Sequence, residues 1–204
     1  MNVLAIGAHP DDIEFGCGGT LLKLSRAGHN ISQLVMTSGE CGGNPEVRRR
    51  EQEAVSAFLG ATEVIWGNQK DTKIPVDNEV IGIIDNAIKR TAADLVFFNH
   101  DQDTHQDHRS LAFCAMSATR YTKWALAFEV PTSANFTPSF FVDIAEVMDD
   151  KLKLLSLHAS QIDKMCVPHL TITENALACA GFRGFQGKVK YAEGFMPIRF
   201  LMDW

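Results

Sequence analysis

The chain has 204 residues, of which 46% are hydrophobic, and a formal net charge of −6. This length is sufficient for one large hydrophobic core and too short for two domains of typical size. We therefore predict a single domain over residues 1–204. The pI near 5.6 and the dispersed basic residues argue against nucleic-acid binding. No apolar run reaches the roughly 18 residues of a membrane span, and the N-terminus lacks a signal-peptide pattern, so we expect a cytoplasmic location without membrane attachment.

Apolar runs and segments of helical period alternate along the first half of the chain. The predicted elements are strands at 3–8, 31–38, 62–67 and 94–99 and helices at 19–28, 44–60 and 77–92. Asn44, Pro45 and Gly60 are typical N-cap, first-turn and C-cap residues of the second helix. Alternating strands and helices indicate right-handed crossovers, and therefore an α/β fold whose parallel sheet is covered by helices on both faces.

The second half of the chain is less regular. The predicted elements are helices at 108–120 and 146–158, strands at 125–130 and 139–144, and a late strand within 191–201. Residues 169–188 read as irregular. The five cysteines are odd in number and widely spaced, without a CxxC pair, which favours reduced thiols over disulfides or a thiolate zinc site.

The stretch "AIGAHPDD", residues 5–12, ends the first strand on a histidine and two adjacent acids. In an open α/β sheet, ligands bind at the carboxyl ends of the strands, where these residues begin. His9 and Asp12 can converge on one cation while Asp11 points elsewhere and is free for proton chemistry. The alternative is a turn in which Asp11 or Asp12 caps the next helix.

A second polar cluster, "NHDQDTHQDHR" at 99–109, follows the fourth strand, so both clusters should face one crevice. Two imidazoles, one carboxylate and an open position form a catalytic zinc set. We therefore assign His9, Asp12 and His108 as zinc ligands, although Fe²⁺ or another divalent ion also suits this set. His105 and Asp107 remain as a pair in which the acid can orient the ring and favour its protonated form. A solvated polar loop is the alternative for this cluster.

The segments "AIGAHPDDIEFGCGGTLLKL" and "DTHQDHR" resemble the two signature motifs of the zinc-dependent N-deacetylases of the PIG-L/LmbE family. The similarity continues through "RREQEAVSAFLG", "KLKLLSLHASQ" and "YAEGF", and it spans residue 3 to about 196. It implies a Rossmann-like, mostly parallel LmbE-like fold and hydrolysis of the N-acetyl amide of a small N-acetylated sugar or sugar conjugate. Acetate and a free amine would be the products. The resemblance also implies a homo-oligomer.

The resemblance carries over to individual residues. His9, Asp12 and His108 match the family's metal ligands, and Asp11 matches its general base. His105 matches the imidazole that stabilises or protonates the tetrahedral intermediate, with Asp107 as its orienting partner. Gln106 stands where many members have proline, at a position without proposed chemistry.

Three further residues are candidates for substrate binding. Arg48 falls on the apolar stripe of its helix with Val47, Ala54, Val55, Phe58 and Leu59, where a charge must be paired or face a cavity. Its alternative is a salt bridge with Glu51. Glu40, in the glycine-rich loop 37–45, is a candidate for contacts with sugar hydroxyls, or else part of a plain turn. His158 matches a family position near the site, with a core or surface histidine as the alternative.

Three other functions compete with this prediction. One is a metal-dependent hydrolase of a non-sugar amide on the same scaffold. Another is a nucleotide-binding α/β module, although "GCGGT" at 16–20 does not match the GxGxxG fingerprint. The third is a catalytically silent binding protein, which would have no reason to keep Asp11 and His105 beside the ligands.

Overall fold

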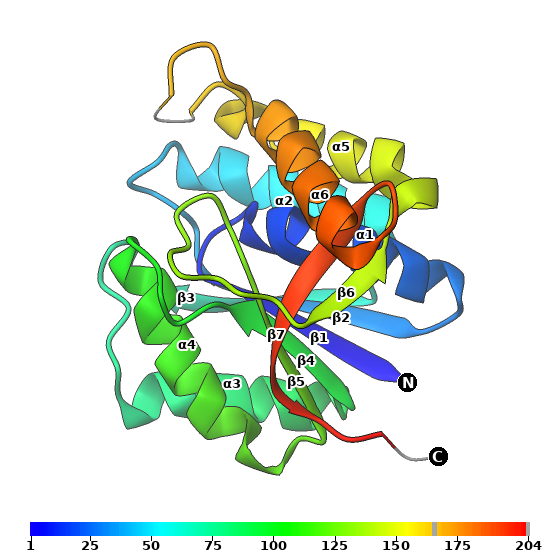
Figure 1. The fold of residues 1–204 in the computed structure, drawn as a ribbon. Helices are drawn as coiled ribbons and strands as arrows, with labels where there is room; N and C mark the ends of the chain where they lie inside the picture. The colour runs from blue at the N-terminus through cyan, green and yellow to red at the C-terminus, as the bar shows by residue number, and fades with distance from the viewer. Residues whose placement is uncertain (165–166, 203–204) are drawn as a thin grey trace.

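The computed structural model describes residues 1–164 and 167–202, and this part of the chain forms one seven-stranded sheet with the strand order β3-β2-β1-β4-β5-β7-β6 (Figure 1). The strands are β1 (Asn2–Gly7), β2 (Asn30–Thr37), β3 (Glu63–Gln69), β4 (Leu95–Asn99), β5 (Trp124–Phe128), β6 (Phe140–Asp143) and β7 (Ala192–Phe200). Strands β1 to β5 are parallel, whereas β7 runs antiparallel to both β5 and β6. The predicted mostly parallel sheet is confirmed.

Helices cover both faces of the sheet, as predicted (Figure 1). They are α1 (Asp12–Arg26), α2 (Pro45–Leu59), α3 (Asn78–Thr91), α4 (Gln106–Ala118), α5 (Met148–Leu157) and α6 (Ile172–Gly187). A pair, α3 and α4, lies on one face, and the remaining four lie on the other. Each face has its own buried apolar cluster, so the sheet is apolar on both sides. None of the helices in the described residues combines the length and apolar content that crossing a membrane requires.

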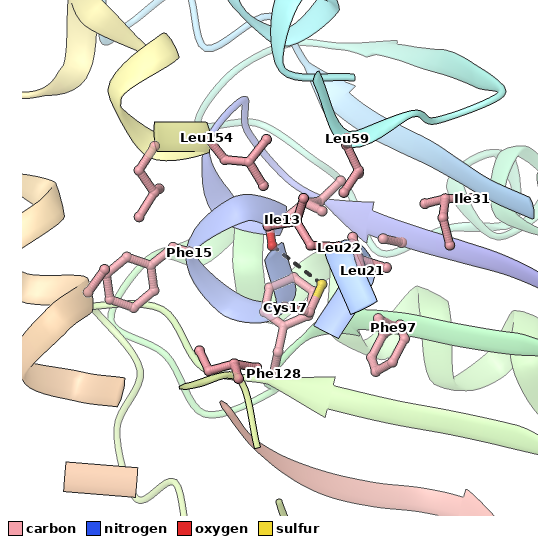
Figure 2. Packing of buried hydrophobic residues seen from close by; sticks show 14 of the residues in the cluster. Ile13, Phe15, Cys17, Leu21, Leu22, Ile31, Leu59, Phe97, Phe128 and Leu154 are labelled. Carbon is pink, nitrogen blue, oxygen red and sulfur yellow. Dashed lines mark hydrogen bonds between the residues drawn. The ribbon is translucent and has the colours of Figure 1, made fainter. Parts of the chain in front are cut away.

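Glycines let α1 approach the sheet closely. A Cβ on Gly16 would lie 2.1 Å from Cδ2 of Phe128, and one on Gly19 would lie 2.9 Å from Ile144. Cys17 lies between them, with its Sγ donating to the Ile13 carbonyl across 3.3 Å in the apolar cluster of this face (Figure 2). The "GCGGT" segment is therefore a packing surface inside a helix and does not form a phosphate-binding loop.

Helix α6 corrects the prediction that residues 169–188 are irregular. Its N-terminus has a capping box, in which the Thr171 hydroxyl accepts from the Glu174 backbone N–H and the Glu174 carboxylate accepts from Thr171. Its buried positions include Ala176, Ala180 and Gly184, so the apolar stripe is made of small side chains. Alanine and glycine at the buried positions do not produce a clear helical period of large apolar residues in the sequence, which explains the wrong prediction.

Two element details also differ from prediction. Helix α1 begins at Asp12, directly after the histidine-acid motif, whereas a start near residue 19 was expected. In α2, Ala54 is exposed, and Gln52 and Ser56 occupy the buried stripe in its place. Polar side chains are buried there because Gln52 donates to the buried Glu14 carboxylate across 2.9 Å. The Asn44, Pro45 and Gly60 cap signals of α2 are confirmed.

Candidate metal and catalytic site

The two polar clusters meet at the carboxyl ends of β1 and β4. These strands are parallel neighbours, and the Ala8 N–H just after β1 donates to the Asn99 side chain at the end of β4 across 3.2 Å. The first cluster continues into α1, and the second continues into α4. His9 and His108 consequently come together although 99 residues separate them in the chain.

Three donor atoms from these clusters form a small triangle. His9 Nδ1 lies 3.2 Å from His108 Nε2, His108 Nε2 lies 3.3 Å from Asp12 Oδ2, and His9 Nδ1 lies 3.5 Å from that oxygen. Donors bound at about 2.1 Å around a tetrahedral ion are roughly 3.4 Å apart. The spacing and the N, N, O donor set therefore fit a divalent metal ion such as Zn²⁺.

Carboxylates hold the opposite nitrogens of both imidazoles. His9 Nε2 lies 3.0 Å from Asp71 Oδ1 and 3.2 Å from Asp107 Oδ2, and His108 Nδ1 lies 3.1 Å from Asp103 Oδ1. When the rings are neutral, a carboxylate accepts the ring N–H at these nitrogens, which would leave the triangle nitrogens with lone pairs for a metal ion. The sequence prediction missed Asp71 and Asp103, although Asp71 follows β3 at the same sheet edge and Asp103 is part of the second cluster.

The electrostatics of this pocket favour a cation. Burial would lower the pKa of His9, but the carboxylates of Asp107, Asp12 and Asp71 raise it well above its ordinary value. Burial likewise opposes charge on His108, yet Asp12 and Asp103 raise its pKa to about 9. Burial would raise the pKa of Asp12, but His108 and His9 hold it well below its usual range.

Within the described residues, two other groups of donors are close enough to hold an ion: His9 with His105 and His108, and His9 with Asp71 and Asp107. The second is poorly suited, because both Asp107 oxygens accept backbone N–H bonds, from Thr72 at 2.7 Å and from Ile74 at 3.1 Å. The His105 ring contacts both other imidazoles, with ring centroids 4.6 Å from His9 and 4.7 Å from His108. It therefore borders the ion site in any of these arrangements.

The predicted carboxylate–imidazole pair of Asp107 and His105 is wrong. The Asp107 carboxylate points to His9, and it is the Asp107 backbone N–H that donates to His105 Nδ1, across 3.2 Å. Burial and the neighbouring His9 and His108 lower the pKa of His105, contrary to the predicted protonated ring. A neutral ring whose Nδ1 accepts a hydrogen bond carries its proton on Nε2. His105 can therefore donate one hydrogen bond from Nε2.

Asp11 has an unusual backbone and a separate partner. Its φ of 101° is in the left-handed region, a conformation that costs about 1–3 kcal/mol for residues other than glycine. Its side chain makes no capping hydrogen bond, and its Oδ2 accepts from Arg48 Nη2 across 3.2 Å. Burial raises the pKa of Asp11, partly against the lowering effect of Arg48, to about 6. Asp11 thus occupies the N-cap position of α1, but the alternative in which its side chain caps the helix is wrong.

Arg48 joins three segments around Asp11. It is buried in the first turns of α2 and donates to the carbonyls of Gly39, at 2.9 Å, and Pro10, at 2.6 Å, as well as to Asp11. Gly39 has a φ of 64°, and a Cβ there would lie 1.8 Å from Arg48 Nη1, so this position requires glycine. The alternative Arg48–Glu51 salt bridge is wrong, because Glu51 accepts from Ser160.

Glu40 and His158 lie outside the cleft lining. The Glu40 carboxylate accepts from the Asp71 backbone N–H across 2.9 Å, and so supports the loop that holds His9. His158 is fully buried, with Nε2 at 3.1 Å from Glu14 Oε2. The structure therefore supports the alternative in which His158 is a core histidine. Its role there is to provide the buried Glu14 carboxylate with a charged or hydrogen-bonding partner.

These groups border an open cleft of about 600 Å³. The predicted residues that line it are His9, Asp11, Asp12, Arg48, His105 and His108. Its other lining residues include Cys41, Gly42, Asp71, Val130, Pro131, Thr132, Gln161, Lys164, Ile172 and Asn175. The three-donor triangle, Asp11 and His105 thus share one solvent-accessible space large enough for a small molecule.

Comparison with known proteins agrees with this geometry. The model of the family described as "PIG-L: GlcNAc-PI de-N-acetylase" matches residues 4–119. The uncharacterized deacetylase YaiS of Escherichia coli is 35% identical over 167 residues, which cover 78% of this chain and 90% of that protein. The diacetylchitobiose deacetylase of Thermococcus kodakarensis is 29% identical over 231 residues, covering 98% and 84% of the two chains.

A solved structure agrees as well. The N,N'-diacetylchitobiose deacetylase of Pyrococcus horikoshii superposes with a TM-score of 0.84 at 26% identity, over 96% of this chain and 83% of that one. The Rossmann-like sheet and the histidine-acid site define an amide hydrolase that acts on carbon–nitrogen bonds other than peptide bonds. The chain belongs to the PIG-L deacetylase family.

Proposed function

We propose that the chain hydrolyses the N-acetyl amide of a small N-acetylated sugar or sugar conjugate. In this proposal His9, Asp12 and His108 hold a divalent metal ion, and Zn²⁺ is the preferred ion. The observation that carries this proposal is the triangle of donor atoms, 3.2 to 3.5 Å apart, beside Asp11 and His105 in one cleft. The diacetylchitobiose deacetylases among its relatives support a sugar substrate. The products are acetate and a free amine.

The ion, when bound, would supply Lewis acidity, which makes water more acidic and polarises an amide carbonyl. The Asp11 carboxylate takes the proton of the attacking water. With a pKa of about 6, this carboxylate is mostly ionised near pH 7 and can accept a proton. Because its pKa is close to the working pH, its protonated form can also donate the proton again. After attack, protonated Asp11 returns the proton to the nitrogen of the leaving amine. Arg48 keeps the carboxylate in place throughout.

His105 acts on the carbonyl oxygen of the substrate. The negative charge on that oxygen grows as water adds, and a donor aimed at it stabilises the transition state more than the ground state. The Nε2–H of His105 supplies this donor, and the Asp107 backbone N–H keeps the ring in the required tautomer. This role replaces the protonated imidazole expected from sequence.

The test combines metal analysis with an acetate assay. Protein purified without chelators should contain about one equivalent of a divalent metal and release acetate from N-acetylglucosamine conjugates. Removal of the ion should abolish release, and adding Zn²⁺ should restore it. Release from N-acetyl amino acids but from no sugar conjugate would favour the non-sugar amide hydrolase instead. An enzyme that keeps full activity after verified metal removal would contradict the metal assignment.

We also propose that the chain forms a homo-oligomer, as the family resemblance implies. The outer face of α6 supports this proposal, because Leu177, Phe182 and Phe185 have 38%, 58% and 74% of their surface exposed. Several large apolar side chains exposed on one helix favour a protein interface.

A further inference from the structure

The connection from β5 to β6 leaves the sheet beside the segment that carries the second polar cluster. Its first residues line the cleft, and they are Val130, Pro131 and Thr132. Backbone contacts fasten the two segments together. The Thr104 N–H donates to the Thr132 carbonyl across 3.0 Å, and Asp103 and Ser133 form an isolated antiparallel bridge. One wall of the cleft is therefore attached to the segment that leads into α4.

The buried Asp103 carboxylate connects this segment to the two imidazoles at the start of α4. Its Oδ1 lies 3.1 Å from His108 Nδ1 and accepts from the His105 backbone N–H across 2.8 Å. His108 Nε2 belongs to the donor triangle, and His105 is the N-cap residue of the helix that carries His108. One carboxylate thus fixes the ring direction of the candidate ligand and the backbone of the candidate oxyanion donor.

Ser133 holds the other oxygen of this carboxylate. Its Oγ–H donates to Asp103 Oδ2 across 2.9 Å, and its Oγ accepts from the Val130 N–H across 3.0 Å. The direction of both bonds is fixed, because a backbone N–H can only donate and a carboxylate accepts. The Thr132 side chain adds a further hydrogen bond to Asp103. With both oxygens bonded, the carboxylate cannot turn away from His108 without breaking the bond to Ser133.

We propose that Ser133 is a positioning residue of the metal site, because its hydroxyl fixes the Asp103 carboxylate. That carboxylate in turn directs the His108 ring and the His105 backbone. This inference rests on the proposed function, in which His108 binds the ion and His105 donates to the substrate carbonyl oxygen. Ser133 does not belong to the cleft lining, so it acts through Asp103 and not by touching the substrate.

Ser133→Ala removes the bond to Asp103 Oδ2 and allows the carboxylate to rotate. Loss of the group that contacts a ligating histidine typically weakens metal affinity by about 10- to 100-fold. Ser133 lies one contact farther out, and Thr132 remains, so we expect zinc affinity to fall by about 3- to 10-fold. At saturating Zn²⁺, kcat should fall by about 3- to 10-fold and KM should stay within about twofold, because a misdirected His105 weakens a hydrogen bond made in the transition state.

The experiment uses the full chain and two further variants. Ser133→Thr keeps the hydroxyl and should retain most of the zinc affinity and kcat of the wild type. Ser139→Ala is the matched control, because it makes the same substitution at an exposed position of the same connection, outside the cleft lining. Competition with a zinc-binding dye measures affinity, and the visible absorption spectrum of the Co²⁺-loaded protein reports the ligand geometry. This spectrum should change in Ser133→Ala and match the wild type in Ser139→Ala.

A purely structural role for Ser133 would give a different pattern. In that case Ser133→Ala would lower stability to urea or raise KM, while its zinc affinity and Co²⁺ spectrum matched the wild type. This pattern would overturn the inference, because Ser133 would then only fasten the loop. Equal zinc affinities in Ser133→Ala and Ser133→Thr, both below the wild type, would overturn it as well, since the hydroxyl would make no difference.

A readout without metal or turnover separates this inference from the proposed reaction. In metal-free protein with isotope-labelled histidine, NMR detects the His108 Nδ1–H that Asp103 holds. Exchange of this proton with water should be faster in Ser133→Ala than in the wild type. If no glycoside is deacetylated but zinc affinity and this exchange change as expected, the reaction is wrong and the positioning role stands. If deacetylation proceeds while neither changes, the reaction stands and the positioning role does not.

Discussion

Asp11 and Asp12 are adjacent in the chain, yet their carboxylates have different partners. The left-handed backbone at Asp11 turns its side chain toward Arg48, while Asp12 faces the two imidazoles. Burial raises the pKa of Asp11, and the imidazoles lower that of Asp12. Neighbouring acids of identical chemistry thus differ in their ability to exchange a proton near neutral pH.

Matched substitutions at these acids should separate their roles. Asp11→Asn should retain the metal, because asparagine tolerates the left-handed backbone, while turnover falls by about 100-fold or more. Asp12→Asn should weaken metal binding itself, since it removes an anionic ligand. Metal content after dialysis and acetate release, measured on both variants, check these expectations. Normal turnover in Asp11→Asn would refute its role as the base.

Asp107 should act through His9, because its carboxylate contacts His9 Nε2. Asp107→Asn should therefore weaken metal affinity by about 10- to 100-fold, as is typical when the partner of a ligating histidine is lost. Gln106→Ala in the same turn is the control, because the Gln106 side chain donates to the Thr72 loop carbonyl and to no other group among the described residues. Competition with a zinc-binding dye measures both variants. Equal affinity in Asp107→Asn and the wild type would contradict this role of Asp107.

At the scale of elements, α1 carries the first half of the site and packs against the sheet through glycines. Gly16 and Gly18 offer a matched pair within this helix. A Cβ on Gly16 would overlap the Phe128 ring, whereas the nearest atom to a Cβ on Gly18 is Leu154 Cδ1 at 3.5 Å, an ordinary contact.

Gly16→Ala should therefore lower the free energy of unfolding by about 1–3 kcal/mol through overpacking. Gly18→Ala should raise it by about 0.5–1 kcal/mol, because alanine favours the helix and fits the space. Urea unfolding followed by circular dichroism measures both. Two variants of equal stability would contradict the packing described for α1.

The buried Glu14–His158 pair connects α1 to the end of α5. Burial opposes charge on both residues, but each holds the other ionised, so the pKa of Glu14 is lowered and that of His158 is raised. A raised histidine pKa adds stability that is fully present below the unfolded value near 6.5 and is lost as pH rises through the folded value.

His158→Gln should accordingly destabilise the metal-free protein by about 3 kcal/mol at pH values near 6 and by less near pH 9. Denaturant unfolding of the wild type and the variant at both pH values measures this difference. The KM of the variant should stay close to the wild-type value, because His158 does not line the cleft. A pH-independent loss of stability would show that His158 contributes by packing alone.

At the scale of the whole molecule, the exposed apolar face of α6 should mediate self-association. Phe185→Glu should shift the wild-type oligomer toward monomer, because a carboxylate is costly to bury in an apolar interface. Size-exclusion chromatography with light scattering measures the mass. Glu79→Gln, at an exposed position of α3, is a control that should leave the mass unchanged. A monomeric wild type would refute the proposed homo-oligomer.

The sequence by itself determined the order of strands and helices through residue 158 and the two clusters that form the site. The hydrophobic periods of strands and helices are local properties of the sequence, and the loops that follow parallel strands lie at the same edge of the sheet. The proximity of His9, Asp12 and His108 could therefore be predicted from the sequence alone. The small-residue stripe of α6 escaped this reasoning because its burial depends on packing rather than on apolar contrast.

Only the tertiary structure decided which atoms meet. Side-chain direction depends on loop backbone and long-range packing, as at Asp11, whose φ no local pattern reveals. For this reason Asp107 was assigned to the wrong imidazole, Asp71 was missed, and His158 was placed near the substrate although it is buried against Glu14. Residue type and spacing predict which groups reach an edge of the sheet, whereas their pairing is set by contacts between segments that are distant in the chain.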